Sequence, residues 1–196
     1  MVYNKMDRFD NKYNLAGKLL VALPSLNNDA YFAHSVVYVC LHQPNGSMGI
    51  VINKRLSEYS FSDLTMMTSL KNYAKLSEIN IYSGGPLETA RGMVLHSVDY
   101  KREDTQVISN GIAISSDSQI ITDIAFDNGP TEKLVALGYS FWQPSQLEQE
   151  IYNNHWLVVD ANHDLLFHTK DEDKWQKALD INGISLDKFI NVIGHC

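Results

Sequence analysis

The sequence predicts an α+β domain built on a mostly antiparallel or mixed sheet, and three observations support this fold class. First, the chain of 196 residues is 44% hydrophobic and 20% charged, which is typical of a soluble globular domain with a sizeable core. Second, strand-like runs occur in pairs separated by single helical segments, rather than in strict alternation with helices. Third, turn signals such as Asn45-Gly46 join consecutive strand-like runs directly. Residues 1–14 are polar and are expected to form an arm, and residues 15–196 a single domain.

The N-terminal part of the domain contains the clearest hairpin signal. Asn45-Gly46 can supply the positive φ angles that a tight hairpin requires, and Pro44 presets the turn before it. Apolar and β-branched residues dominate the runs on either side. Strands are therefore predicted over residues 17–23, 35–42 and 48–53, with a short helical turn over 30–33.

Two helices are predicted in the middle of the chain. The first, over residues 60–70, begins with a capping box at Ser60 and Asp63. The second, over 116–127, has isoleucines at helical spacing and precedes the stop signal Gly129-Pro130. Strands are predicted over 79–82, 92–97 and 107–115, the last of them interrupted by a bulge at Asn110-Gly111.

The C-terminal part begins with a predicted strand over residues 134–139. Ser145 is the expected N-cap of a helix, because Glu148 follows it at capping-box spacing. A later helix has Trp175 and Leu179 on one face and ends at Gly183. The remaining elements are a hairpin over 156–160 and 165–168 and a short last helix from Ser185.

The charge balance and the short apolar runs exclude several functional classes. A net charge of -7 and a pI near 5.4 repel a phosphate backbone, and the basic pairs are limited to Lys54-Arg55 and Lys101-Arg102. The sequence therefore argues against a nucleic-acid partner. No apolar run approaches the roughly 18 residues of a membrane span, and no secretory signal begins the chain. A cytoplasmic protein without a membrane partner is expected.

The two cysteines, Cys40 and Cys196, do not have the spacing of a zinc site or a disulfide framework. The favoured interpretation is a buried thiol at Cys40 and an unpaired tail residue at Cys196. A bridge between them stays open as an alternative.

The run Gly46-Ser47-Met48-Gly49 looks like a phosphate-binding loop. Anion sites in glycine-rich loops usually lie at a helix N-terminus, however, and no helix is predicted here. The structural interpretation is that Gly46 closes the turn and Gly49 allows a bulge or close packing. The sequence also lacks the nucleotide, dinucleotide, zinc-protease and α/β-hydrolase fingerprints, so no cofactor is assigned.

Two histidines are candidates for chemistry. His42 and His96 lie on predicted strands near glycine-rich turns, and imidazole titrates near neutral pH and binds metals. If the two met, they could form an acid/base site, or a metal site completed by Glu148 or Glu150. In the alternative interpretation each imidazole only donates a hydrogen bond to a backbone carbonyl or packs at a strand edge. No metal-ligand spacing decides between them.

Arg91 and the segment Gly84-Gly85-Pro86 form a second candidate group. The guanidinium of Arg91 could bind a carboxylate or phosphate ligand, or it could pair with Glu88. Both interpretations stay open.

Three blocks of residues complete the pattern. They are Leu15 to Pro24 followed by Tyr38 to His42 and Asn45 to Asn53, Gly84 to Pro86 with Arg91 to His96, and Gly138 to Trp142 with Gln146 to Glu150 and Trp156. In this order, from about residue 15 to the C-terminus, they resemble the AlgH/YqgE family of bacterial proteins.

The resemblance implies a bent sheet folded toward a pseudo-barrel and flanked by helices. It implies no catalytic residues, and some members are labelled transcriptional regulators. In two places the chain departs from the family pattern, because Phe141 and Ser145 stand where glycine is usual. The family-motif positions are candidate site residues, namely His42, Asn53, Gly84, Gly85, Pro86, Arg91, His96, Gln146 and Glu150.

Three functions are compatible with these observations. The first is a non-enzymatic protein that binds a small molecule or a protein partner and acts indirectly in regulation. The second is a hydrolase with His42 and His96 at its acid/base or metal site and Arg91 orienting an anion. The third is a regulator that binds DNA directly. The absence of a catalytic signature favours the first.

Overall fold

A computed structural model of the chain describes residues 14–61, 63 and 79–183. Its strands are β1 (Lys18–Ala22), β2 (Val36–Gln43), β3 (Gly46–Val51), β4 (Ile81–Ser83), β5 (Leu87–Ser97), β6 (Gln106–Ser109), β7 (Ile112–Ser115), β8 (Lys133–Trp142) and β9 (Trp156–Asp160). They form one sheet in the order β6-β7-β5-β8-β3-β2-β1-β9, with β4 added beside β8. The pairing of β4 with β8 is parallel and the other pairings are antiparallel. The predicted α+β class is confirmed.

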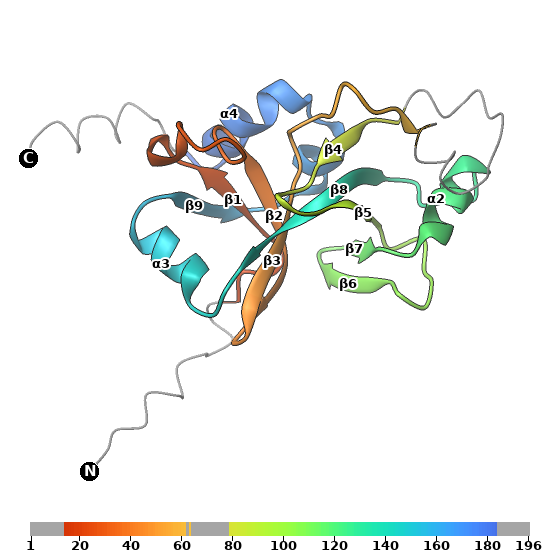
Figure 1. The fold of residues 1–196 in the computed structure, drawn as a ribbon, viewed down its shortest axis with the longest axis horizontal. Helices are drawn as coiled ribbons and strands as arrows, with labels where there is room; N and C mark the ends of the chain where they lie inside the picture. Colours follow the sequence, from red (N-terminus) through yellow and green to blue (C-terminus); the bar gives the residue numbers. More distant parts are fainter. Residues whose placement is uncertain (1–13, 62, 64–78, 184–196) are drawn as a thin grey trace, which may run out of the picture.

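Strand β8 joins the two parts of the sheet. Its first part pairs with β4 and β5, and its last residues pair with β3. In Figure 1 it runs between the group β1, β2, β3 and β9 and the group β4 to β7. Before Gly138, which has φ +75, the even-numbered residues Leu134 and Ala136 face the largest core cluster. After it, the odd-numbered residue Tyr139 faces that cluster. The side-chain alternation therefore changes phase at Gly138, as it does at a bulge.

Residues of the central strands alternate between two buried faces. Leu19 and Val21 belong to the largest core cluster, here called the inner core, whereas Leu20 and Ala22 face the opposite side. This explains why these strands read as continuous apolar runs. The helices are η2 (Pro24–Leu26), α2 (Ser118–Ala125), α3 (Gln146–Tyr152), η4 (Asp164–His168) and α4 (Asp171–Ile181).

The helices cover both faces of the sheet. Helices α4 and η4 contribute to the inner core through Leu179 and Leu166. Helix α3 packs Leu147 on the opposite face, against residues of β1 and β2, and α2 packs Ile120 there against β5 and β8. In Figure 1, α2 and α3 lie at opposite ends of the molecule.

The hairpin predicted around Asn45-Gly46 is confirmed as β2 and β3, with Gln43 paired to Gly46. Pro44 and Asn45 form its loop, and the positive φ, +136, falls on Gly46 rather than on Asn45. The expectation for Gly49 is also confirmed, because a Cβ there would lie 2.6 Å from Cγ1 of Val37. No phosphate-type loop exists at this hairpin, since its residues continue directly into β3.

The single strand predicted over residues 107–115 is wrong. The segment forms two antiparallel strands, β6 and β7, joined by Asn110-Gly111. Both turn residues have positive φ angles, 52° and 76°, as a type I′ hairpin turn requires. The turn chemistry of Asn-Gly therefore outweighed the continuous β-branched run.

The C-terminal hairpin predicted over 156–160 and 165–168 is also wrong. Strand β9 pairs with β1 instead, and residues Asp164–His168 form a single π-helical turn. Leu165 and Leu166 both belong to the inner core, and a turn of helix can place two consecutive side chains there, whereas a strand would direct them to opposite faces. The side chain of Asn162 accepts the backbone N-H of Leu165 and so starts the turn.

Ser145 is the N-cap residue of α3, as predicted, but the predicted capping hydrogen bond is absent. Ser145 has φ 64 and makes no capping hydrogen bond with its side chain. The side chain of Gln146, the first residue of the helix, instead accepts the backbone N-H of Gln143 before it. A left-handed conformation favours glycine, which accounts for the family's usual glycine where this chain has Ser145.

Several predictions fall on residues at the edge of what the structure describes. The capping box is present, since Asp63 accepts hydrogen bonds from the backbone and the hydroxyl of Ser60. Most of the helix predicted over 60–70, the arm over 1–14 except Asn14, the last helix from Ser185, and Cys196 lie outside the described residues. Residues 30–33 form turns. Within the described ranges, no helix is long and apolar enough to cross a membrane.

Candidate functional site

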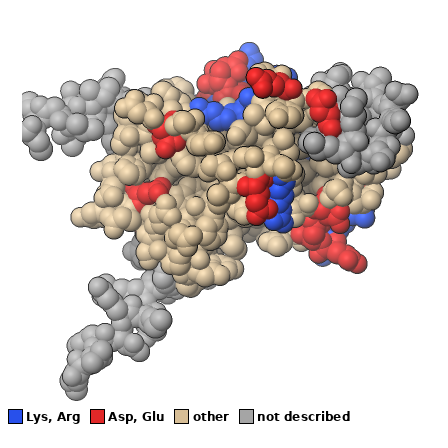
Figure 2. All heavy atoms as spheres, viewed as in Figure 1, with Lys and Arg blue, Asp and Glu red and all other residues tan. Residues whose placement is uncertain are grey.

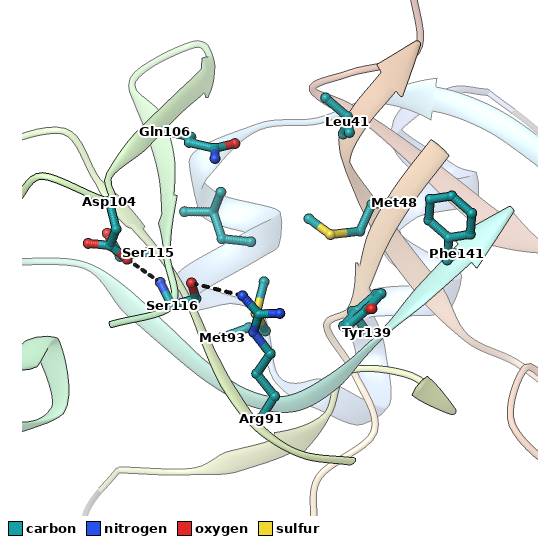
Figure 3. A pocket seen from close by; sticks show the side chains of 11 residues that line it. Leu41, Met48, Arg91, Met93, Asp104, Gln106, Ser115, Ser116, Tyr139 and Phe141 are labelled. Atoms are coloured by element: carbon teal, nitrogen blue, oxygen red, sulfur yellow. Dashed lines mark hydrogen bonds between the residues drawn. The ribbon is translucent and has the colours of Figure 1, made fainter. Parts of the chain in front are cut away.

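A cleft of about 300 Å³ lies at the margin of the inner core, between the β2–β3 hairpin and the strands β5, β6 and β7. Met93 and Ile114 belong to the inner core, and Met48 and Tyr139 pack against it. The floor of the cleft is therefore a continuation of the core. The other residues that line it are Leu41, Arg91, Asp104, Gln106, Ser115, Ser116 and Phe141 (Figure 3).

A bulge in β5 presents Arg91 to this cleft. The register between β5 and β8 shifts between Leu87 and Gly92, and Glu88 has φ 45. Opposite the bulge, a Cβ on Gly138 would lie 2.7 Å from the carbonyl oxygen of Leu87, so glycine allows the strands to approach. Figure 3 shows the guanidinium of Arg91 reaching into the centre of the cleft.

Arg91 has a hydrogen-bond partner on each side, and the contact with one of them is long. Its Nη1 lies 3.2 Å from the carboxylate of Glu88, which also accepts the hydroxyl hydrogen of Tyr139 at 2.7 Å. These hydrogen bonds, from Tyr139 first and then from Arg91, hold the pKa of Glu88 below its usual range. The Nη2 of Arg91 lies 3.4 Å from the hydroxyl of Ser116, a long contact. The guanidinium therefore keeps hydrogen-bonding capacity for a ligand.

Asp104 forms the opposite wall of the cleft. Its Oδ2 accepts the backbone N-H groups of Ser116 and Asp117, at 2.6 and 2.7 Å, just before α2 begins. Its Oδ1 is buried without a hydrogen-bond partner among the described residues. The cleft thus has one basic and one acidic side chain in its lining.

His96 is fully buried, is not among the residues that line the cleft, and belongs to a hydrogen-bonded chain that includes the lining residue Ser115. Its Nδ1 lies 2.8 Å from the carbonyl oxygen of Ser97, so Nδ1-H donates and Nε2 accepts from the hydroxyl of Ser115 at 3.1 Å. The hydroxyls of Ser115 and Thr105 lie 2.8 Å apart. Burial lowers the pKa of His96, which favours the neutral ring that this chain requires.

His42 lies elsewhere. Its Nδ1 is 2.8 Å from the hydroxyl of Ser47, and its Nε2 is 3.6 Å from the carboxylate of Glu148 in α3. Strands β3 and β8 separate His42 on β2 from His96 on β5, which places the two strands about 14 Å apart along the sheet. The structure therefore does not bring these histidines together. Within the described residues, no group of three or more histidine, cysteine or acidic side chains could hold a metal ion.

Asn53, Gln146 and Glu150 have partners within the fold. The Asn53 amide accepts the N-H of Val36 and donates to the carbonyl of His34, which ties the end of β3 to the start of β2. Gln146 donates to Glu150 at 2.9 Å. Oε2 of Glu150 accepts both indole N-H groups, those of Trp142 and Trp156, at 2.9 and 2.8 Å. These side chains lie outside the cleft lining, and their candidacy as ligand-binding residues stays a prediction.

Gly84, Gly85 and Pro86 connect β4 to β5. The backbone of Gly84 donates to the carbonyl of Leu137 and accepts from the N-H of Val51, so it lies between β8 and β3. Both glycines pack against the backbone of β8 too closely for a side chain, and Pro86 follows in a bend. This close packing is enough to explain why glycine occupies both positions. A ligand-binding role for Gly84, Gly85 and Pro86 stays a prediction.

The basic pairs are partly occupied by contacts within the protein. Lys54 donates to the carbonyl of Ala33, and Arg102 pairs with Asp123 at 2.8 Å. On the face shown in Figure 2, basic side chains lie beside acidic ones and form no continuous band. DNA binding through a basic face gains no support from this arrangement.

A second polar cluster joins Glu132 to two histidines. The Nδ1 of His163 and the Nε2 of His168 each lie 2.6 Å from a carboxylate oxygen of Glu132, and the Nε2 of His163 is 3.0 Å from the carbonyl oxygen of Asn110. Both nitrogens of His163 therefore face acceptors, which requires the protonated ring. The hydrogen bond to Glu132 is the main cause that raises the pKa of His163.

This geometry predicts a pH dependence of stability. Because the pKa of His163 is higher in the folded than in the unfolded chain, its contribution is complete below 6.5 and is lost as the pH rises through the folded-state pKa. Thermal unfolding of wild type and His163→Asn, measured from about pH 6 to about pH 9, should show a stability difference that shrinks with rising pH. A constant or growing difference would contradict the prediction.

Of the sequence candidates, Arg91 lines the cleft. Sequence reasoning missed Asp104, Gln106, Ser116 and the methionines Met48 and Met93 as lining residues. Phe141, one of the two departures from the family pattern, also lines the cleft. Met48 lies in the run Gly46-Ser47-Met48-Gly49, but no spacing rule connects it to lining residues more than 40 positions away.

Comparisons with known proteins agree on one family. A family model described as AlgH-like matches residues 19–187. A UPF0301 protein of Afipia carboxidovorans is 41% identical over 189 residues, covering 92% of this chain and 90% of its own length. One from Ruegeria pomeroyi is 40% identical and covers 93% and 99% of the two chains.

Two solved structures resemble this fold. The solution structure of the AlgH protein from Pseudomonas aeruginosa matches with a TM-score of 0.78 and 30% identity, over 91% of this chain and 94% of that one. The crystal structure of a Corynebacterium diphtheriae protein, DIP2367, matches with a TM-score of 0.67 and 20% identity, over 87% and 88%. The second likeness concerns the fold alone.

Proposed function

This chain belongs to the AlgH-like family, and from that premise we propose that it is a non-enzymatic binding protein whose cleft holds a small molecule. The observation that carries the proposal is a charged guanidinium, that of Arg91, directed into a cleft with an apolar floor. Ligand sites commonly combine apolar walls with a few polar groups that orient the ligand.

The described contacts favour binding over the hydrolase alternative. An acid/base or nucleophilic site needs its groups within hydrogen-bond reach of the substrate. His96 is fully buried beneath Ser115, and His42 lies against Glu148 near α3, so neither side chain reaches the cleft. Arg91 and Ser116 do reach it, and they are suited to orienting a ligand.

In this proposal the protein acts in regulation through ligand binding and not through contact with DNA. Two of the four residues in the basic pairs, Lys54 and Arg102, already contact groups of the protein itself. A bound ligand would bridge the β2–β3 hairpin and the strands β5 to β7, and could thereby fix their relative position.

A substitution at the mouth of the cleft tests the proposal. Gln106 is exposed on the edge strand β6, and its side chain points over the cleft (Figure 3). Tryptophan is favourable in strands, so Gln106→Trp should fold and fill the cleft. We expect 1-octanol, octylamine or octanoate to shift amide NMR signals of cleft residues in wild type. Binding to Gln106→Trp should be about tenfold weaker or lost.

The matched control is Val107→Trp. Val107 is the next residue on β6, is 66% exposed, and lies outside the cleft lining. This variant adds the same indole to the opposite face of the strand and should bind the probes as wild type does. Equal binding by both variants, or no cleft signal with any of the three probes, would rule out the cleft as a binding site.

A further inference from the structure

We propose that the cleft selects a small monocarboxylate with an apolar body, held by the guanidinium of Arg91. This inference rests on the proposed function and names the ligand class of that same site. It follows from the size of the cleft, the donors that Arg91 has available, and the acidic groups around it.

The volume limits the ligand's size. The cavity measures about 300 Å³. Because a water molecule occupies about 30 Å³ in the liquid, the space corresponds to roughly ten non-hydrogen atoms. A nucleotide or larger cofactor would extend out of this space, whereas an eight-carbon acid fits within it.

The floor of the cleft suits an apolar body. Met48 and Met93 contribute flexible, polarisable side chains, and Phe141 contributes an aromatic wall that is 38% exposed. Methionines adapt to ligands of different shape, and an exposed aromatic ring gains from being covered. A ligand that buries an alkyl or aryl group here would extend the inner core.

Arg91 supplies the polar anchor. Its side chain is 50% exposed, and its contact with Ser116, at 3.4 Å, is long enough to be exchanged for a ligand without much loss. The planar guanidinium offers parallel N-H groups that match the two oxygens of a carboxylate. The contact with Glu88 at Nη1 leaves the other edge of the group facing the cleft.

The surrounding charges favour a single negative charge on the ligand. Glu88 lies 3.2 Å from Arg91, and Asp104 lines the same cleft. Arg91 carries one positive charge and these two carboxylates carry two negative ones, so the site is already net negative. Each further negative charge on a ligand adds repulsion, and a monoanion is therefore opposed less than a doubly charged phosphate. The chain's net charge of -7 acts in the same direction.

The test compares three probes of one chain length: octanoate, octanamide and octyl phosphate. Titration calorimetry with wild type should give an affinity for octanoate about tenfold or more above that for octanamide, because a charge-assisted hydrogen bond is stronger than a neutral one. Octyl phosphate should bind more weakly than octanoate. Arg91→Gln should lower the octanoate affinity about tenfold and leave octanamide within about twofold.

The control variant is Arg55→Gln, which removes the same charge from an exposed position outside the cleft lining. It should leave octanoate binding within about twofold of wild type. Equal affinities for octanoate and octanamide, a preference for octyl phosphate, or unchanged octanoate binding in Arg91→Gln would each overturn the monocarboxylate assignment. Those outcomes would leave a cleft that binds its probes, whereas failure of all three probes to bind would reject the proposed function itself.

Discussion

Replacing Gly85 with alanine is expected to destabilise the fold by about 3 kcal/mol or more, because no space exists for the added methyl group. A Cβ on Gly85 would lie 2.2 Å from the carbonyl carbon of Tyr139 and 2.4 Å from the backbone nitrogen of Ser140. These are backbone atoms of β8, so relief requires the β4–β5 connection to move away from the strand that joins the two parts of the sheet. Thermal unfolding should show a midpoint about 6–12 °C lower for each 3 kcal/mol lost.

The matched control is Gly92→Ala, in the strand β5 that follows this connection. A Cβ on Gly92 would meet no atom within 4 Å. Alanine there should change the free energy of unfolding by no more than about 1 kcal/mol. If Gly85→Ala unfolded at the wild-type temperature, packing would not explain this glycine, and its candidacy as a ligand-binding residue would gain weight.

Replacing Asp171 with alanine is expected to cost about 3 kcal/mol, because it leaves the charge of Lys174 buried without its partner. Lys174 is 2% exposed, lies 3.1 Å from the carboxylate of Asp171, and donates to the carbonyl of Ile52 at 2.8 Å. Burial lowers the pKa of Lys174, because removing the charged ammonium group from water costs free energy. Asp171 also accepts the hydroxyl hydrogen of Tyr82, whose pKa is raised to about 12 by burial and then by this carboxylate.

A double variant separates the buried charge from the other contacts of Asp171. Asp171→Ala combined with Lys174→Met removes both charges and keeps the apolar volume of the lysine side chain. We expect it to recover most of the stability lost in Asp171→Ala, since a buried pair can be replaced by apolar groups at little cost. Urea unfolding of the four species in a double-mutant cycle measures this coupling. Additive losses would contradict an ion-pair role.

Local sequence signals predicted those elements whose causes are local. The hairpin of β2 and β3 follows from turn residues beside two apolar runs, and α2 from isoleucines at helical spacing before Gly129-Pro130. The same reasoning failed at 107–115, where the type I′ turn of Asn110-Gly111 was interpreted as a bulge. It failed again at 165–168, because the partner of β9 proved to be β1, far away in the sequence.

The cleft could not be predicted from local signals. Its lining comes from six strands, β2, β3, β5, β6, β7 and β8, together with the segments beside β6 and α2. Arg91 was identified by its type, but the bulge that directs it into the cleft depends on Gly138, some fifty residues away and on another strand. The two histidines were correctly singled out as polar residues on strands, yet the strand order separates them.

The sequence by itself determined the α+β class, the family, the acidic balance and the main turns, since each depends on composition or on residues close together in the chain. Only the tertiary structure decided which polar residues share a site. It brought Arg91, Ser116 and Gln106 around one apolar floor and placed His42 and His96 on strands that two others separate. The physical reason is that strand order decides which strands are neighbours, and the phase change at Gly138 decides which face each side chain of β8 occupies. Neither can be derived from the spacing of residues along one strand.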